Sequence, residues 1–291
     1  MALTINTNLS SLIAQRSLLE STNALNTSIE RMTTGYKINH SKDSAAGYAI
    51  SKLWETQLTS LDIAADNAAM GMDMLTTAEG TYDLLVGHLQ RVRDLTEQAA
   101  NGTYGASSKD AIEAEITARL SEIDRIALSS EFNGLKLMDG SITSDVKLQV
   151  GINKDANSQI TLVSTLFAKA DVATLFAAAP VTTIATVAKA CAGKDTATGH
   201  SAPDLLAEID KVITAISKRA TDLGAAQNRV ESAISAIDVQ SQNLTSSLST
   251  IRDTDVAEES SKYIQAQILQ QASATLLSTA NQLPSIALNL I

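Results

Sequence analysis

The spacing of apolar residues from Leu58 onward constrains this fold most tightly. Apolar side chains recur every three or four residues, and Glu79 is the one polar interruption. The positions are Leu58, Leu61, Ala65, Ala68, Met72, Leu75, Tyr82, Val86 and Leu89. Such spacing over several heptads is typical of a helix that packs along another helix. It predicts one helix over residues 57–100, about 65 Å long at 1.5 Å per residue.

The chain beyond this helix repeats the pattern twice. Asn101-Gly102 predicts a helix end, because glycine readily adopts the left-handed conformation. A second helix is predicted at 108–129, where Ile112, Ile116, Leu120, Ile123 and Ala127 share one face. A third is predicted at 204–252. The first two form an antiparallel hairpin, and no proline precedes Pro180 to interrupt them.

The segment between the second and third helices has a different period. From Phe132 to residue 163 apolar and polar residues alternate, with turn residues at Asp139-Gly140, which predicts a small β element. Residues 164–203 are rich in Ala and Thr, contain Pro180 and Cys191, and show no sustained period. They are expected to form a short variable surface insert.

Both chain ends carry a thin apolar stripe. Between Ile264 and Ile291 there is no Asp, Glu, Lys or Arg, so this stretch is expected to be buried against other copies of the chain. The fold class that follows is mainly α: an antiparallel coiled-coil or helical-bundle rod with a small β-hairpin element and paired N- and C-terminal helices. The predicted assembly residues are Leu9, Leu12, Leu19, Leu25, Ile29, Leu269, Leu276 and Leu283.

Composition and motifs disfavour several function classes. A net charge of −10 is unlike that of nucleic-acid binders. The three histidines have no metal-ligand spacing and no catalytic motif occurs, so we expect no enzyme activity, metal or cofactor. Cys191 has no partner cysteine and is expected to be inert. No apolar stretch suits membrane insertion, and the N-terminus is unlike a cleaved signal peptide.

Five segments of the chain resemble bacterial flagellin, and the likeness covers residues 1–163 and 204–291. The segments are MALTINTNLSSLIAQRSL at the start, SIERMTTGYKINHSKDSAAGYAIS at 28–51, DLGAAQNRVES at 222–232, IRDTDV at 251–256 and AQILQQASATLLSTANQLPSIALNLI at the end. Several long motifs in the right order make the resemblance specific.

The resemblance implies a domain organisation and a function. Residues 1–45 and 254–291 would form the inner assembly domain, 46–56 a connecting spoke, and 57–163 with 204–253 the helical core. The chain would be exported unfolded by the flagellar type III apparatus with an export chaperone. It would polymerise beneath a filament cap, next to hook-associated proteins, into the extracellular filament used for swimming.

The resemblance also implies a host receptor. The segment LQRVRDLTEQ at 89–98 is similar to the flagellin region recognised by animal Toll-like receptor 5, with Asp94 where the family commonly has Glu. The receptor-binding residues would be Gln90, Arg91, Arg93, Leu95, Glu115 and Arg119. These charges could equally be the solvated face of a long helix. For the whole chain, the alternatives are a hook–filament junction protein and a secreted receptor ligand or adhesin.

Overall fold

The computed structural model describes residues 8–177, 183–194 and 202–289, with the backbone alone over 283–289. The chain divides into two compact units, residues 1–58 with 242–291 and residues 59–241. In chain order the long helices are α1 (Leu9–Thr34), α2 (Ala45–Ala100), α3 (Ala106–Ser129), α6 (Ala202–Arg252) and α7 (Val256–Asn289). The prediction of a mainly helical fold with a small β element is confirmed.

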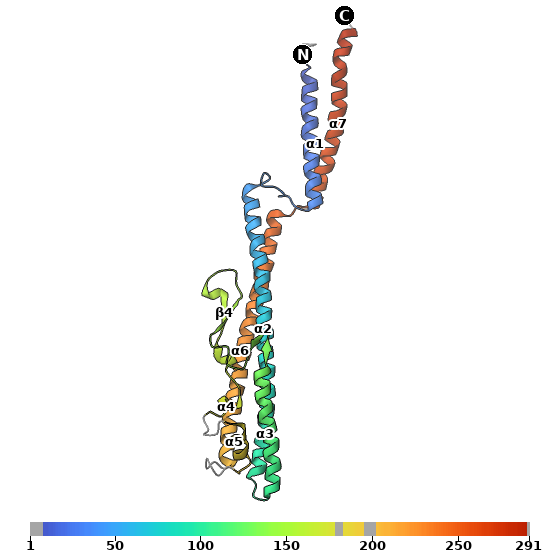
Figure 1. The fold of residues 1–291 in the computed structure, drawn as a ribbon. Helices are drawn as coiled ribbons and strands as arrows, with labels where there is room; N and C mark the ends of the chain where they lie inside the picture. The colour runs from blue at the N-terminus through green and yellow to red at the C-terminus, as the bar shows by residue number, and fades with distance from the viewer. Residues whose placement is uncertain (1–7, 178–182, 195–201, 290–291) are drawn as a thin grey trace. The chain divides into compact units, whose positions relative to one another are not determined.

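The unit of residues 59–241 is built on α2, α3 and α6, which run side by side (Figure 1). The predicted hairpin is confirmed, since α2 ends at Ala100 and α3 begins at Ala106. The first buried row of α2 contains Leu61, Ala68, Leu75, Tyr82 and Leu89, as predicted. Its second buried row is Ala64, Ala78, Leu85 and Val92, whereas the predicted Ala65, Met72 and Val86 are half-buried.

Two short antiparallel strand pairs follow α3 in the described residues. Strands β1 (Glu131–Phe132) and β2 (Leu135–Lys136) form a tight turn with positive φ at Asn133 and Gly134. Strands β3 (Val146–Gln149) and β4 (Gln159–Leu162) pair in register from Val146↔Leu162 to Gln149↔Gln159, with the 3₁₀ helix η1 (Ala156–Ser158) between them. Leu148 of β3 lies against α2 at Gly71, so the β3–β4 pair packs on that helix.

The predicted surface insert at 164–203 has both exposed and buried residues in its described part, and the buried ones were not predicted. It forms the 3₁₀ helix η2 (Ser164–Phe167), α4 (Val172–Leu175) and α5 (Ile184–Cys191). Its fully or almost fully buried side chains include Leu166, Phe167, Val172, Phe176, Val187 and Cys191. Polar contacts tie it to α3: the backbone N–H of Val172 donates to Asp124 Oδ1 at 2.7 Å, and Lys194 forms ion pairs with Asp110 and with Glu113, the latter at 3.0 Å. The insert thus adds a further layer of core.

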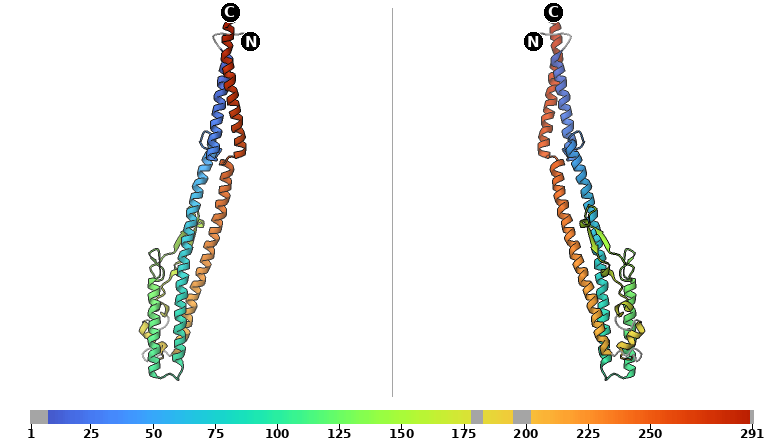
Figure 2. Two further views of the ribbon diagram at one scale, coloured as in Figure 1. Left: turned by 90° about the vertical axis from the view of Figure 1, so that its right-hand side faces the viewer. Right: turned by 90° about the vertical axis from the view of Figure 1, so that its left-hand side faces the viewer.

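The other unit pairs the two ends of the chain. Helices α1 and α7 lie side by side in both views of Figure 2, with their outer ends next to the two termini. Residues 35–38, which follow α1, lie antiparallel to residues 250–254, which precede α7. The backbone N–H of Lys37 donates to Arg252 O at 2.7 Å, and that of Thr254 donates to Gly35 O at 2.9 Å. The Arg252 guanidinium stacks 4.0 Å from the centre of the Tyr36 ring and pairs with Glu55 of α2.

The predicted spoke at 46–56 is wrong, because these residues lie inside α2. The helix begins at Ala45, directly after Ser44, whose hydroxyl accepts the N–H of Gly47 at 3.2 Å. The helix continues through Gly47. Because Gly47 has no side chain, Ile38 can pack against it: a Cβ added at Gly47 would lie 2.6 Å from Ile38 Cδ1. The non-helical connection runs instead from Gly35 to Ser44. Among the described residues, no helix is long and apolar enough to span a lipid bilayer.

Candidate assembly interface

The contact between α1 and α7 is made by small side chains. Ala14, Ser21 and Ser28 are the buried residues of α1, each seven residues after the one before. Ala266, Ser273 and Ala280 are buried on α7 with the same spacing. A seven-residue repeat keeps one helix face turned to its partner, and small residues let the two backbones approach closely. This seam buries little apolar surface, so the pair gains little hydrophobic stabilisation from it.

Polar contacts add to the seam near the outer end of the pair. The Asn8 side chain accepts from the N–H of Ser11 at 3.1 Å, which caps α1, and donates to Ala280 O at 2.7 Å. The hydroxyl of Ser11 donates to the side-chain oxygen of Asn281 at 2.7 Å. The N-cap of α1 therefore also fixes its register against α7.

The large apolar residues of both helices lie outside the seam. Of the predicted assembly residues, Leu25 is half-buried and Leu283 lies outside the described side chains. The exposed fractions of the others are 65% for Leu9, 55% for Leu12, 60% for Leu19, 44% for Ile29, 49% for Leu269 and 62% for Leu276. Contiguous exposed apolar surface marks an interaction site in a soluble protein. The expectation that these residues are buried against other copies stays a prediction, and in the subunit the six with printed fractions are exposed.

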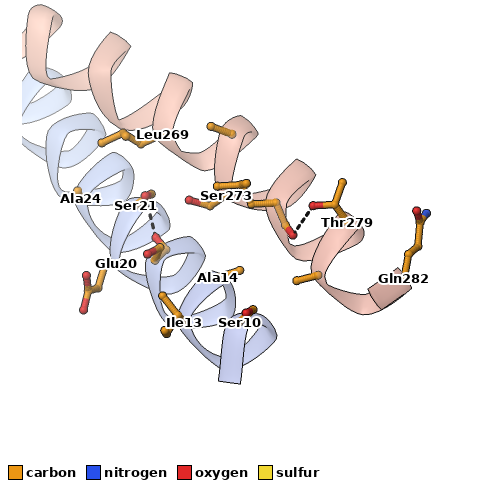
Figure 3. Close-up of a pocket in the computed structure, with 14 residues that line it drawn as sticks. Ser10, Ile13, Ala14, Glu20, Ser21, Ala24, Leu269, Ser273, Thr279 and Gln282 are labelled. Atoms are coloured by element: carbon orange, nitrogen blue, oxygen red, sulfur yellow. Dashed lines mark hydrogen bonds between the residues drawn. The ribbon is translucent and has the colours of Figure 1, made fainter. Parts of the chain in front are cut away.

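A groove runs along the seam between α1 and α7 (Figure 3), and its lining includes the seam residues Ala14, Ser21, Ser273 and Ala280. It has a volume of about 1080 Å³ and is bounded mainly by alanine, serine and aliphatic side chains. Figure 3 shows Ile13 and Ala14 on the α1 side and Leu269 and Ser273 on the α7 side. Glu20 is the one charged residue in its lining, and it pairs with Arg16 at 3.0 Å.

One charged residue occupies the seam itself. Glu259 continues the repeat of Ala266, Ser273 and Ala280 toward the inner end, and it is 2% exposed. Its Oε2 lies 3.9 Å from Arg31 and 3.7 Å from Lys262, whereas Oε1 has no hydrogen-bond partner in the described part of the chain. Lys262 also pairs with Glu258, and this hydrogen bond raises the pKa of Lys262. A buried carboxylate with one unsatisfied oxygen weakens the pair.

Sequence reasoning did not identify the seam residues, although a signal was present. The apolar stripes at the two ends were predicted to pack against other copies, and no residues were predicted for the contact between α1 and α7 within one chain. The seven-residue repeat of Ala and Ser at 14, 21 and 28 and at 266, 273 and 280 is visible in the sequence. A repeat of small residues at a constant heptad position indicates close helix packing.

The predicted receptor-binding residues lie on α2 and α3, and the structure brings some of them together. Arg91 Nε donates to Glu115 Oε1 at 2.9 Å, joining the two helices on an exposed surface that Gln90 shares. Arg93 points to α6 instead, where its Nε lies 2.7 Å from Asp210 Oδ1, and this hydrogen bond raises the pKa of Arg93. Arg119 is half-buried on α3.

Leu95 does not belong to this surface. Its side chain is 2% exposed and lies in the core of the unit formed by residues 59–241. The expectation that Leu95 contacts a receptor is therefore corrected, because it stands on the buried face of α2 between Val92 and Ala99.

The described residues contain no group of three or more His, Cys, Asp and Glu side chains that could hold a metal ion. Cys191 is fully buried, and burial raises the pKa of its thiol to about 11. A protonated, buried thiol is a poor nucleophile.

The chain is mainly helical, its two ends pair through small residues, and the leucines of these ends are exposed. This arrangement is typical of a self-assembling structural protein. The chain belongs to the bacterial flagellin family: its residues 5–143 match the bacterial flagellin N-terminal helical region, and residues 206–291 match the C-terminal helical region. Members of this family are structural filament proteins, not enzymes.

Known relatives match nearly the whole chain. A flagellar filament 30.7 kDa core protein of Treponema maltophilum is 32% identical over 283 residues, 95% of each chain. A flagellin of Halalkalibacterium halodurans is 33% identical over 287 residues, 99% of each chain. A crystal structure of Bacillus cereus flagellin is 28% identical, with a TM-score of 0.46, and the match covers 63% of this chain and 94% of that one.

Proposed function

We propose that this chain polymerises into the extracellular flagellar filament used for swimming, through the outer surface of α1 and α7. The observation that carries the proposal is the exposure of large apolar residues on the uncharged part of α7: Leu276 is 62% exposed, and residues 264–291 contain no charged side chain. Exposed leucines without nearby charges gain most when other copies cover them.

The test is Leu276→Asp. The introduced carboxylate would be exposed in the subunit, so the subunit should keep its fold, but it would be buried without a partner in the filament. Sedimentation and electron microscopy should show monomers where the unchanged chain gives filaments. Leu128→Asp, at a leucine of α3 that is 51% exposed, is the matched control and should still polymerise. Normal filaments from Leu276→Asp would refute the proposal.

Export in an unfolded state by the flagellar type III apparatus is part of the proposal. The seam of Ala and Ser and the half-satisfied Glu259 support it, because both make pairing of the ends weak before assembly. An export chaperone would cover the ends, the filament cap would promote polymerisation, and hook-associated proteins would adjoin the filament. We expect cells without the export apparatus to lose secretion of the chain, and the chain secreted by cells that have the apparatus to show an uncleaved mass. Secretion that continues without the apparatus would contradict this route.

We also propose that Toll-like receptor 5 binds the surface of α2 and α3, through Gln90, Arg91, Glu115 and Arg119, with Arg93 beside it on the α6 side of α2. The ion pair of Arg91 with Glu115 supports this, because it holds two of these side chains in one place across two helices. Arg91→Ala should reduce signalling in receptor-reporter cells treated with monomer. Arg125→Ala, which removes an exposed pair with Glu122 on α3, is the control. Equal potency of both variants would count against the site.

The hook–filament junction protein remains the second candidate, since it would share the paired ends. The abundance of this chain in sheared filaments distinguishes the two candidates. A filament subunit forms most of the protein there, whereas a junction protein is a trace component. A monomer that stays soluble at high concentration with ordered ends would instead favour a secreted receptor ligand or adhesin.

A further inference from the structure

The chain contains two Asn-Gly pairs, Asn101-Gly102 and Asn133-Gly134. The backbone nitrogen that follows an asparagine can attack the carbonyl carbon of the asparagine side chain, and a following glycine obstructs this attack least because it has no side chain. All four residues are exposed. Local sequence and solvent access therefore make the two pairs alike, so a difference in their reactivity comes from the fold.

The Asn101-Gly102 pair lies in the turn between α2 and α3, and its reacting groups are free to meet. The Oδ1 of Asn101 accepts a hydrogen bond from the backbone N–H of Thr103 at 3.1 Å. This bond folds the carboxamide back over its own backbone, as in an Asx turn. The N–H of Gly102 makes no hydrogen bond in the described part of the chain. Residues 101–105 are all exposed, so the turn has little packing to hold it in place.

The N–H of Thr103 also favours the attack itself. When the nitrogen of Gly102 approaches Cγ of Asn101, negative charge develops on Oδ1. A hydrogen-bond donor that already points at this oxygen stabilises the developing charge.

The Asn133-Gly134 pair is held in a tight hairpin. Asn133 and Gly134 have φ values of 49° and 79° and connect β1 to β2. The ion pair between Glu131 and Lys136, at 2.7 Å, joins the two strands, and the next residue, Leu137, is fully buried. Ring closure at Asn133 requires rotation of the backbone between the asparagine and the glycine, which this pairing opposes. The hairpin must therefore open before Asn133 can react.

We propose that Asn101 is a site of spontaneous deamidation in the folded chain, and that the fold protects Asn133. The nitrogen of Gly102 forms a bond to Cγ of Asn101, while the side-chain nitrogen leaves as ammonia together with the proton of the Gly102 amide. The product is a cyclic succinimide. Water then opens the ring at either carbonyl group and leaves aspartate or isoaspartate at position 101.

The modification changes the end of α2. A carboxylate at position 101 stands next to the C-terminus of this helix, where the peptide dipoles disfavour negative charge and where the last turn has no basic residue. Isoaspartate also adds the side-chain carbon Cβ to the backbone of the turn. The added negative charge separates modified from unmodified chains by ion exchange.

The test compares the two asparagines in the purified full chain at pH 8, both folded and in guanidinium chloride. Peptide mapping by mass spectrometry follows the conversion of each site with time. In denaturant the two rates should agree within about threefold, because glycine follows both asparagines. In the folded chain the rate at Asn101 should stay within about threefold of its denatured value or exceed it, whereas the rate at Asn133 should fall about tenfold or more.

Two variants test the atoms involved, with circular dichroism to verify the fold. Thr103→Pro removes the N–H that donates to Asn101, so it should slow the folded reaction about threefold or more and leave Asn133 unchanged. Gly102→Ala should also slow it, because the methyl group hinders the attack, and its Cβ would have no atom of the subunit within 4 Å. The proposal is overturned if folded Asn101 reacts no faster than Asn133, or if Gly102→Ala reacts as fast as the unchanged chain. An unchanged rate in Thr103→Pro would refute the role of its N–H.

Discussion

The hydroxyl of Tyr82 donates a hydrogen bond of 2.8 Å to the carbonyl oxygen of Leu166. Tyr82 is fully buried in the middle of α2, and Leu166 belongs to η2, which begins the insert. The guanidinium of Arg219 on α6 reaches the neighbouring carbonyl oxygens of Ala168 and Lys169 at 3.4 Å. Two of the long helices thus satisfy backbone groups of the insert, which fixes where it enters the core.

Tyr82→Phe should lower the free energy of unfolding of this unit by about 1 kcal/mol, because the carbonyl of Leu166 loses its donor inside the core. Urea unfolding followed by circular dichroism is the measurement. Tyr104→Phe is a suitable control, since Tyr104 is 39% exposed in the turn before α3. If both variants lowered the free energy of unfolding equally, the buried hydrogen bond of Tyr82 would contribute no more than an exposed hydroxyl does.

Two glycines of α2 should respond in opposite ways to substitution by alanine. At Gly71 an added Cβ would lie 2.3 Å from Leu148 Cδ1, so Gly71→Ala should displace the β3–β4 pair and destabilise the unit by about 1–3 kcal/mol. At Gly80 nothing lies within 4 Å, so Gly80→Ala should stabilise it by about 0.5–1 kcal/mol through helix propensity. Thermal unfolding of the monomer compares them. If both substitutions stabilised the unit, Leu148 would not pack against Gly71.

Cys191 should be unreactive while the chain is folded. Its thiol is fully buried, and burial raises its pKa to about 11, so neither access nor ionisation favours attack at pH 8. Modification by iodoacetamide should be complete in denaturant and negligible in its absence, as mass spectrometry would show. In a chain that also carries Ser108→Cys, an exposed position of α3, the second thiol should react within minutes. Equal rates at both positions would mean that α5 opens readily.

Alkaline pH should destabilise the unit that contains Cys191. The thiol has a pKa near 9.0 in the unfolded chain and about 11 in the folded one, so the folded state holds its proton more tightly. This contribution is complete below pH 9 and is lost as the pH rises through 11, by up to about 2–3 kcal/mol. Burial also raises the pKa of Tyr82, which acts in the same direction. Cys191→Ala should flatten the decline of the unfolding free energy between pH 9 and 11; an unchanged slope would assign it to other groups.

The sequence by itself determined the long helices. Apolar spacing located α2, α3 and α6, because a helix that packs along another must repeat its contacts about every 3.5 residues. Alternation predicted the strands between Val146 and Leu162, and the motifs at both ends of the chain predicted the family. These signals are local or periodic, and one chain is enough to detect them.

Only the tertiary structure decided which surfaces the helices turn toward each other. The terminal leucines were predicted to pack against other copies, but the residues that join the two ends within one subunit were not predicted: small residues such as Ser21 and Ser273 make that contact, and Leu276 is exposed. The insert was expected at the surface, yet Phe167 and Phe176 are in the core. Leu95 was predicted to lie on a binding surface, yet it is in the interior. An apolar residue signals burial somewhere, and the partner that covers it is defined only when segments far apart in the sequence come together.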